Sequence, residues 1–148
     1  LSDDLESFKN LILKFRAISS RLIVVKISPD SAEEEVLKVC EILLNIPKTV
    51  INIGNSKYIK ANKVGLSSKT FSKKGGGLSG ESLYSNTLKI VKLISSKYDL
   101  PIIATGGVSS YDNVKELLDN GASLTGVATL LVSDPFKIPL INYRLSND

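Results

Sequence analysis

The chain has 148 residues, 43% of them hydrophobic, and a formal net charge of +4. This length suffices for one globular domain with its own core, and no apolar run reaches the ~20 residues that a membrane helix needs. There is no histidine, and Cys40 is the only cysteine. This composition excludes internal disulfides, zinc sites built on cysteine or histidine, and a Ser-His-Asp triad.

The first residues of the given sequence do not follow the pattern of a signal peptide. Polar residues follow Leu1 where a signal peptide would be apolar, and the sequence contains no methionine at all. We therefore expect a piece of a longer protein.

Two helices and two strands are predicted in the first third of the chain. Apolar residues at helical spacing predict a helix over 3–18, and a β-branched run predicts a buried parallel strand over 22–27. Lys26 interrupts this strand. It either reaches out to a sheet edge or, at the carboxyl end of a barrel strand, points into a site, and spacing alone does not decide.

The second helix is predicted to begin at a capping box of Ser31 and Glu34 and to end at Pro47. Cys40 lies on its apolar face and is expected to be plain core. The next strand is predicted over 49–53, with the polar Asn52 near its end. A loop of some twenty residues follows, long enough for a lid or a site loop.

That loop contains most of a basic stretch from Lys57 to Lys74, which has no acidic residue. It could attract a nucleic acid or an anionic substrate; a solvated, mobile loop is the preferred interpretation, and no aromatic RNA-binding motif accompanies it. Its lysines are Lys57, Lys60, Lys63, Lys69, Lys73 and Lys74.

In the second half, strands and helices continue to alternate. A helix is predicted over 87–97 and a strand over 101–104. The following helix is capped by Ser109 or Ser110 and ends at Gly121. A last strand is predicted over 124–131, and a final helix from 133 towards 145 contains an unfavourable Pro139.

Three turns built from small residues lie where strands meet turns or helix starts. Such positions let backbone N–H groups approach an anion closely. In order along the chain they favour the phosphate-binding rim of a β/α barrel, whereas singly each could be a tight loop. The turns are Gly75-Gly76-Gly77-Leu78-Ser79-Gly80, Ala104-Thr105-Gly106-Gly107 and Val127-Ala128-Thr129.

The predicted order of elements indicates a parallel α/β sheet. Four strands are too few for a closed eight-stranded barrel, which takes about 250 residues. An open, doubly wound sheet is the alternative, but the turns favour barrel strands five to eight. We therefore predict that residues 1–148 form one domain, a partial TIM (β/α)8 barrel of about four carboxyl-terminal units.

Six short motifs, taken in order along the chain, are specific in combination. They are Val25-Lys26-Ile27-Ser28-Pro29-Asp30, Ile51-Asn52, Gly76-Gly77-Leu78-Ser79-Gly80, Pro101-Ile102-Ile103-Ala104-Thr105-Gly106-Gly107-Val108, Gly121-Ala122-Ser123 and Ser133-Asp134-Pro135-Phe136. With these motifs the chain, from about Arg21 to Ile141, resembles the carboxyl-terminal half of dihydroorotate dehydrogenase. The ending Asp134-Pro135-Phe136 and the Gly-Leu-Ser-Gly form look closest to the soluble, NAD-linked subtype that pairs with an iron–sulfur flavoprotein subunit.

The resemblance implies an FMN-dependent oxidation of dihydroorotate to orotate in de novo pyrimidine (UMP) biosynthesis. Lys26 would match the lysine that contacts the flavin ring, and Asn52 an asparagine that binds substrate. The FMN ribityl and phosphate groups would be held by backbone groups at positions with small side chains. These positions are Ser79, Gly80, Gly106, Gly107, Ala128 and Thr129.

The chain also departs from the family pattern. Ile53 stands where serine or threonine is usual, and Ala128 where glycine or tyrosine is usual. The family's catalytic base, a cysteine or serine, belongs to the first half of the barrel, and Cys40 does not match it. No catalytic residue is therefore assigned, and the isolated chain is expected to be inactive or nearly so.

Two other functions remain open from the sequence: another FMN or sugar-phosphate barrel enzyme, and a non-catalytic half-barrel for binding or assembly. Expected partners are dihydroorotate or orotate, the amino-terminal half of the barrel, a second copy of the chain, or the iron–sulfur flavoprotein subunit. No nucleic acid partner, no metal site and no membrane segment in this piece are expected. The expected location is the cytoplasm, or mitochondria if a lost amino terminus carries targeting.

Overall fold

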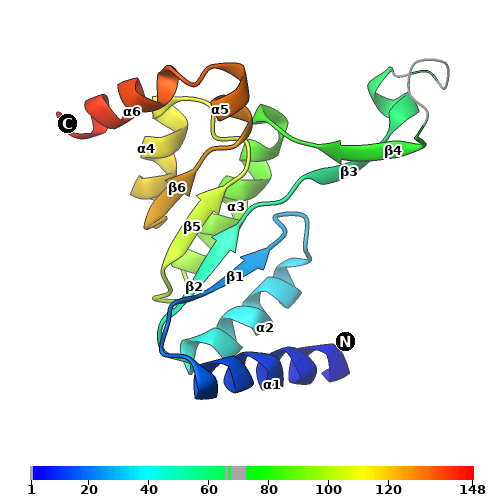
Figure 1. Ribbon diagram of the computed structural model, residues 1–148, viewed down its shortest axis with the longest axis vertical. Helices are drawn as coiled ribbons and strands as arrows, with labels where there is room; N and C mark the ends of the chain where they lie inside the picture. The colour runs from blue at the N-terminus through cyan, green and yellow to red at the C-terminus, as the bar shows by residue number, and fades with distance from the viewer. Residues whose placement is uncertain (1, 66, 68–72) are drawn as a thin grey trace.

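A four-stranded parallel sheet forms the centre of the protein, in a computed structural model that describes residues 2–65, 67 and 73–148. The strands lie side by side in the order β1-β2-β5-β6, so chain neighbours within this sheet are also spatial neighbours (Figure 1). They are β1 (Ile23–Ile27), β2 (Thr49–Ile53), β5 (Ile102–Thr105) and β6 (Leu124–Gly126).

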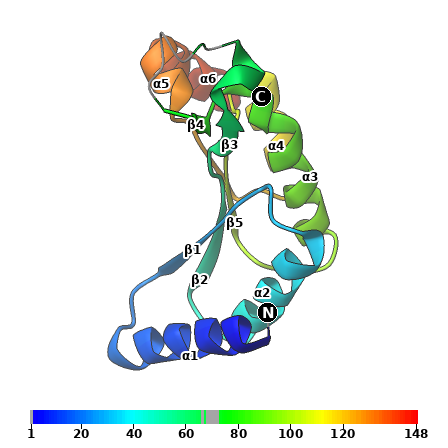
Figure 2. The same ribbon diagram turned by 90° about the vertical axis from the view of Figure 1, so that its right-hand side faces the viewer.

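Helices alternate with these strands, as predicted. Figure 2 shows α2, α3 and α4 along one side of the sheet, while α1 lies at one end of the molecule and α5 and α6 at the other. Helix α3 begins three residues earlier than predicted. The helices are α1 (Ser2–Ile18), α2 (Glu33–Leu44), α3 (Tyr84–Ser95), α4 (Tyr111–Asp119), α5 (Thr129–Ser133) and α6 (Lys137–Leu145).

The core fills the space between the sheet and helices α2, α3 and α4. Alternate residues of β2 and β5 face it, which is the period expected of strands covered by helices on one face. Cys40 is fully buried there, which confirms its prediction as core. The side chains buried most completely are Leu43, Ile51, Ile53, Ile94, Ile102, Leu117, Val36, Val91, Thr87 and Cys40.

The two predicted cap motifs have different outcomes. The Ser110 hydroxyl accepts a 3.1 Å hydrogen bond from the Asn113 N–H at the start of α4, which confirms the cap. The Ser31–Glu34 capping box is wrong, because Ala32 holds the cap position of α2 and makes no side-chain bond. Three glutamates in the first turn of α2 stabilise that end through the helix dipole instead.

The predicted twenty-residue loop is wrong: much of it forms an arm that extends from the body (Figure 1). Strand β3 (Lys57–Lys60) pairs antiparallel with β4 (Gly75–Leu78), and the short 3-10 helix η1 (Ala61–Val64) lies between them. Glycines 75–77 are thus a strand and not a turn. A Cβ on Gly75 would overlap the backbone of Ile59, so glycine permits this close pairing. Lys69 lies outside the described residues.

The end of the chain also differs from its prediction. Strand β6 stops at Gly126, and 129–133 form the short helix α5, because a brief apolar run does not distinguish strand from helix. The segment 134–136 joins α5 to α6. Pro139 lies in the first turn of α6, where its missing N–H costs no helical hydrogen bond, so the residue is well placed.

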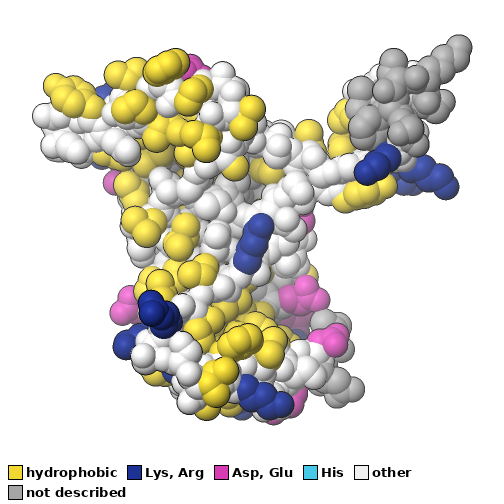
Figure 3. All heavy atoms as spheres, viewed as in Figure 1, with side chains coloured by type: hydrophobic (Ala, Val, Ile, Leu, Met, Phe, Trp, Pro, Cys, Tyr) yellow, Lys and Arg dark blue, Asp and Glu magenta, His cyan; other side chains and the backbone are white. Residues whose placement is uncertain are grey.

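The described residues leave one face of the sheet and both its outer edges open. Among them, β1 and β6 each pair with a single neighbouring strand. Val24 and Leu124 are 48% and 61% exposed on these edge strands, and Figure 3 shows apolar side chains gathered over α1 and over α5 and α6 on this side. Among the described helices, none combines the length and apolar character needed to cross a bilayer.

Candidate functional site

A cleft of about 200 Å³ opens at the carboxyl ends of the parallel strands. All seven residues predicted to bind the cofactor line it: Lys26, Ser79, Gly80, Gly106, Gly107, Ala128 and Thr129. They come from four separate segments of the chain. The structure therefore brings together what the three small-residue turns and the strand lysine predict, at the edge of the sheet where ligands bind α/β folds.

Lys26 provides the charge of this cleft. Its neighbours Val25 and Ile27 are buried among the helices, so the alternation of the strand places Lys26 on the opposite, open face. Within the described part of the chain, the Lys26 ammonium has no hydrogen-bond or ion-pair partner, and no aspartate or glutamate lines the cleft. The site therefore favours an anionic ligand.

Asn52 lies beside Lys26 on the neighbouring strand and is held by Thr105. Residues 26 and 52 are register partners in β1 and β2. The Thr105 hydroxyl lies 2.7 Å from Asn52 Oδ1 and 3.1 Å from the Ile53 carbonyl oxygen. A hydroxyl donates one hydrogen at a time, so we assign the Thr105 hydrogen to the shorter contact, with Asn52 Oδ1. This bond fixes the side chain of Asn52 and leaves the Nδ2 group of Asn52 available to a bound molecule.

Ser79 and Gly80 lie beside the start of α5 at the cleft. Gly80 has a φ of +97°, a conformation that favours glycine, and its carbonyl accepts the Leu83 N–H at 3.0 Å to begin the 3-10 helix η2 (Glu81–Leu83). A methyl carbon of Thr129 lies 3.6 Å from where a Cβ on Gly80 would be. These two predicted segments, some fifty residues apart in sequence, are therefore neighbours in the cleft lining.

The β5–α4 loop packs directly on the first turn of α3. Gly107 has a φ of +75°, and a Cβ there would overlap the backbone nitrogen of Tyr84. The Tyr84 hydroxyl donates a 2.8 Å hydrogen bond to Glu116 of α4. Burial and the nearby Glu116 carboxylate raise the pKa of Tyr84 well above its usual value, so this tyrosine stays protonated.

The cleft is also lined by residues that the sequence-based prediction does not assign to the site: Gly54, Asn55, Ser56, Leu83, Thr105, Val108 and Gly126. Thr105 lies between Gly54 and Gly126, and a Cβ on either glycine would overlap Thr105. The available signal was a polar β-branched residue at the last position of a strand, next to two glycines. Its partner Asn52 becomes evident only from the register of β5 against β2.

Burial shows whether the side chains of Ile53 and Cys40 belong to the core or to the cleft. Ile53 is fully buried on the helix-covered face of β2, opposite to Asn52, so it is a core residue. Cys40 is also fully buried, and burial raises the pKa of its thiol to about 11. Neither side chain reaches the cleft.

The sequence matches one protein family along almost its whole length. The family model for dihydroorotate dehydrogenase covers residues 2–147. The catalytic subunit of the NAD-linked enzyme from Bacillus pumilus is 35% identical over 133 residues, which are 88% of this chain and 41% of that protein. The quinone-linked enzyme from Kocuria rhizophila is 30% identical over 154 residues, covering 96% of this chain and 42% of that protein.

A solved structure shows the same likeness in three dimensions. Dihydroorotate dehydrogenase from Eimeria tenella, in complex with ferulenol, superposes with a TM-score of 0.70 at 26% identity. The match covers 85% of this chain and 34% of that one, so the four strands form a partial TIM barrel, as predicted. The chain spans 42% or less of the relatives described here. With a family match from residue 2 to residue 147 and a barrel segment of the same architecture, the chain belongs to the dihydroorotate dehydrogenase family.

Proposed function

We propose that residues 1–148 are the FMN-binding half of an enzyme that oxidises dihydroorotate to orotate in pyrimidine biosynthesis. The observation that carries the proposal is the cleft, where Lys26, which has no partner among the described residues, lies with three backbone segments poor in side chains. A phosphate-bearing, partly aromatic ligand fits this set of donors, because small residues expose backbone N–H groups and the lysine supplies the balancing charge.

The residues divide into two groups by what they can hold. Ser79-Gly80, Gly106-Gly107 and Ala128-Thr129 would hold the ribityl and phosphate groups of FMN through their backbones. Lys26 would contact the flavin ring, which when bound supplies the electron-accepting chemistry of the reaction. Its fixed positive charge favours negative charge on a neighbouring group.

Asn52 would bind the substrate beside the ring. Thr105 keeps the Asn52 carbonyl occupied at 2.7 Å, so the Nδ2 group can donate to a carboxylate or carbonyl oxygen of dihydroorotate. A donor that is fixed before binding loses less conformational entropy when the substrate binds. Asn52 thus orients substrate and does not abstract a proton.

A proton acceptor for the reaction would come from the other half of the barrel. The described residues that line the cleft include no aspartate, glutamate or cysteine, and Cys40 is fully buried away from it. We therefore expect the isolated chain to bind FMN without oxidising dihydroorotate.

That other half would also cover the open face. Closure of a barrel pairs both outer strand edges and buries the exposed Val24 and Leu124. The amino-terminal half is the partner that the family architecture favours. A second copy of the chain and an iron–sulfur flavoprotein subunit are alternatives that the mass of the purified complex distinguishes.

The proposal is tested by titrating the purified chain with FMN and following the quenching of flavin fluorescence. Lys26→Met should weaken binding about tenfold, the effect of losing a hydrogen bond from a charged group. Lys60→Met is the matched control, because Lys60 is an exposed lysine of β3 outside the cleft, and it should leave binding unchanged.

The amino-terminal half of the Bacillus pumilus catalytic subunit supplies the second arm of the test. Oxidation of dihydroorotate on mixing the two polypeptides would support the assignment. A folded chain that binds no FMN, either alone or with that half, contradicts the proposal and favours the non-catalytic half-barrel.

A further inference from the structure

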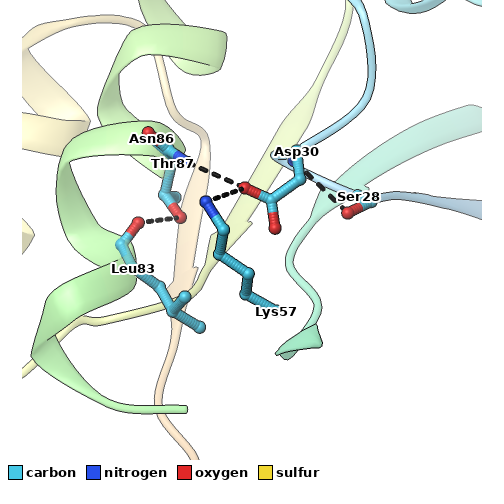
Figure 4. A network of polar contacts seen from close by, with 6 residues as sticks. All are labelled: Ser28, Asp30, Lys57, Leu83, Asn86 and Thr87. Atoms are coloured by element: carbon cyan, nitrogen blue, oxygen red, sulfur yellow. Dashed lines mark hydrogen bonds and ion pairs between the residues drawn. The ribbon is translucent and has the colours of Figure 1, made fainter. Parts of the chain in front are cut away.

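Asp30 receives two donors from separate parts of the chain. Asn86 Nδ2 of α3 donates to Asp30 Oδ1 at 2.8 Å, and Lys57 Nζ of β3 lies 3.5 Å from the same oxygen (Figure 4). Asp30 itself belongs to the loop between β1 and α2. These three residues, which we call the Asp30 network, join three elements that are not neighbours in sequence.

Hydrogen bonds to Ser28 fix the loop that carries Asp30. The Asp30 N–H donates to Ser28 Oγ at 3.3 Å, and the Ser31 N–H donates to the Ser28 carbonyl oxygen at 3.1 Å, so the loop forms a tight turn. Pro29 is buried beneath it. The Asp30 side chain is 29% exposed, which leaves its contacts only partly screened by water.

The two donors lie on either side of the segment that carries Ser79 and Gly80. Lys57 is the register partner of Leu78, the residue immediately before Ser79. Asn86 lies in the first turn of α3, six residues after Gly80 and just beyond η2. The Asp30 carboxylate therefore contacts one end of the segment 78–86 directly, through Asn86, and contacts the strand that pairs with the other end, through Lys57.

The same carboxylate is also close in sequence to Lys26, which forms the charged wall of the cleft. Asp30 follows Lys26 by four residues, at the end of the strand that positions this lysine. Asp30 therefore links the loop that follows the Lys26 strand to elements on either side of Ser79 and Gly80. Neither Asp30 nor its donors line the cleft, so the effect on a ligand is indirect.

We propose that Asp30 is a positioning residue that holds the Ser79–Gly80 segment in its binding conformation, directly through Asn86 and indirectly through Lys57 on the paired strand. The identity of the ligand rests on the proposed function, whereas the mechanical role of Asp30 does not. Loss of the carboxylate frees Lys57 and Asn86 together and lets the segment 79–86 open more often.

Hydrogen exchange in the absence of any ligand tests the mechanical role directly. Amides in 79–86 should exchange about tenfold faster in Asp30→Ala than in the wild type, given the strength of hydrogen bonds to a charged group. Asp30→Asn should lie between them, because it keeps an acceptor for Asn86 and loses the charge that attracts Lys57.

Glu33→Ala is the matched control. Glu33 Oε1 lies 2.7 Å from Lys89 Nζ, so this pair also connects the start of α2 to α3 but touches neither the arm nor the cleft. It should leave exchange in 79–86 unchanged. Equal protection of 79–86 in wild type and Asp30→Ala, or equal acceleration in Glu33→Ala, overturns the role of Asp30.

FMN titration of the same variants separates this inference from the proposed function. If the wild type binds FMN, Asp30→Ala should bind about tenfold more weakly with a melting temperature no lower than that of Glu33→Ala. Weaker binding that merely follows a lower melting temperature contradicts positioning. If the wild type binds no FMN while exchange still accelerates in Asp30→Ala, the proposed function fails and the positioning role stands.

Discussion

The Thr105 hydroxyl lies 2.7 Å from Asn52 Oδ1 and so joins the carboxyl ends of β5 and β2; Thr105 lines the cleft, whereas Asn52 lies beside it. Both residues are only partly buried, yet their bond is enclosed by Gly54 and Gly126, neither of which could carry a Cβ without overlapping Thr105. The site is therefore built around one hydroxyl, and the glycines beside it provide its space.

Removal of that hydroxyl should destabilise the protein measurably. Thr105→Val keeps the branched shape but cannot donate to Asn52, and we expect the free energy of unfolding in urea to fall by about 1 kcal/mol. Thr105→Ser, which retains the donor, should lose less. If serine and valine cost the same, the packing of the Thr105 methyl group matters and the hydrogen bond does not.

The buried thiol of Cys40 predicts a dependence of stability on alkaline pH. Burial raises its pKa from 9.0 to about 11, so the folded state holds the proton more tightly than the unfolded state. This contribution to stability is complete below pH 9 and is lost as the pH rises towards about 11. Wild type should therefore lose more stability than Cys40→Ala across this window.

The same burial makes the thiol unreactive in the native state. The thiolate is the nucleophile, and a fully buried group with a raised pKa exposes very little of it. A disulfide reagent should label Cys40 slowly at neutral pH and rapidly in urea. Rapid labelling of the folded chain would show that α2 opens readily, contrary to its place in the core.

Local patterns predict the central sheet well. The strand over 49–53 has the predicted bounds, because a run of β-branched residues between Pro47 and a polar segment has few alternatives. Lys26 and Asn52 come together because both lie near the carboxyl ends of parallel strands. The placement of the seven predicted cofactor-binding residues in one cleft, with Asn52 beside Lys26, follows from this regular geometry.

Contacts between distant segments explain what the sequence does not predict. The arm is not predicted because 57–60 pair with three glycines and a leucine beyond a long connection, and glycine is a poor strand former. The contacts of Thr105 and Asp30 are equally hard to predict from the sequence. Their partners, Asn52 for one and Asn86 and Lys57 for the other, depend on strand register and on how loops meet.

Gly107 should be among the least replaceable residues of the chain. It combines a φ of +75° with a Cβ position that would overlap the backbone of Tyr84, so Gly107→Ala must both strain its own backbone and displace the start of α3. A residue forced into such a conformation costs about 1–3 kcal/mol before any overlap is counted. We expect the free energy of unfolding to fall by at least about 2 kcal/mol.

Gly76→Ala is the control for this prediction. Gly76 belongs to β4, its φ is not positive, and nothing lies within 4 Å of where its Cβ would be. Alanine there should leave unfolding in urea almost unchanged, because alanine replaces glycine without a steric conflict. Equal costs at both positions would mean that the β5–α4 loop moves away from α3 freely, in which case the backbone wall formed by 106–107 is not a fixed part of the cleft.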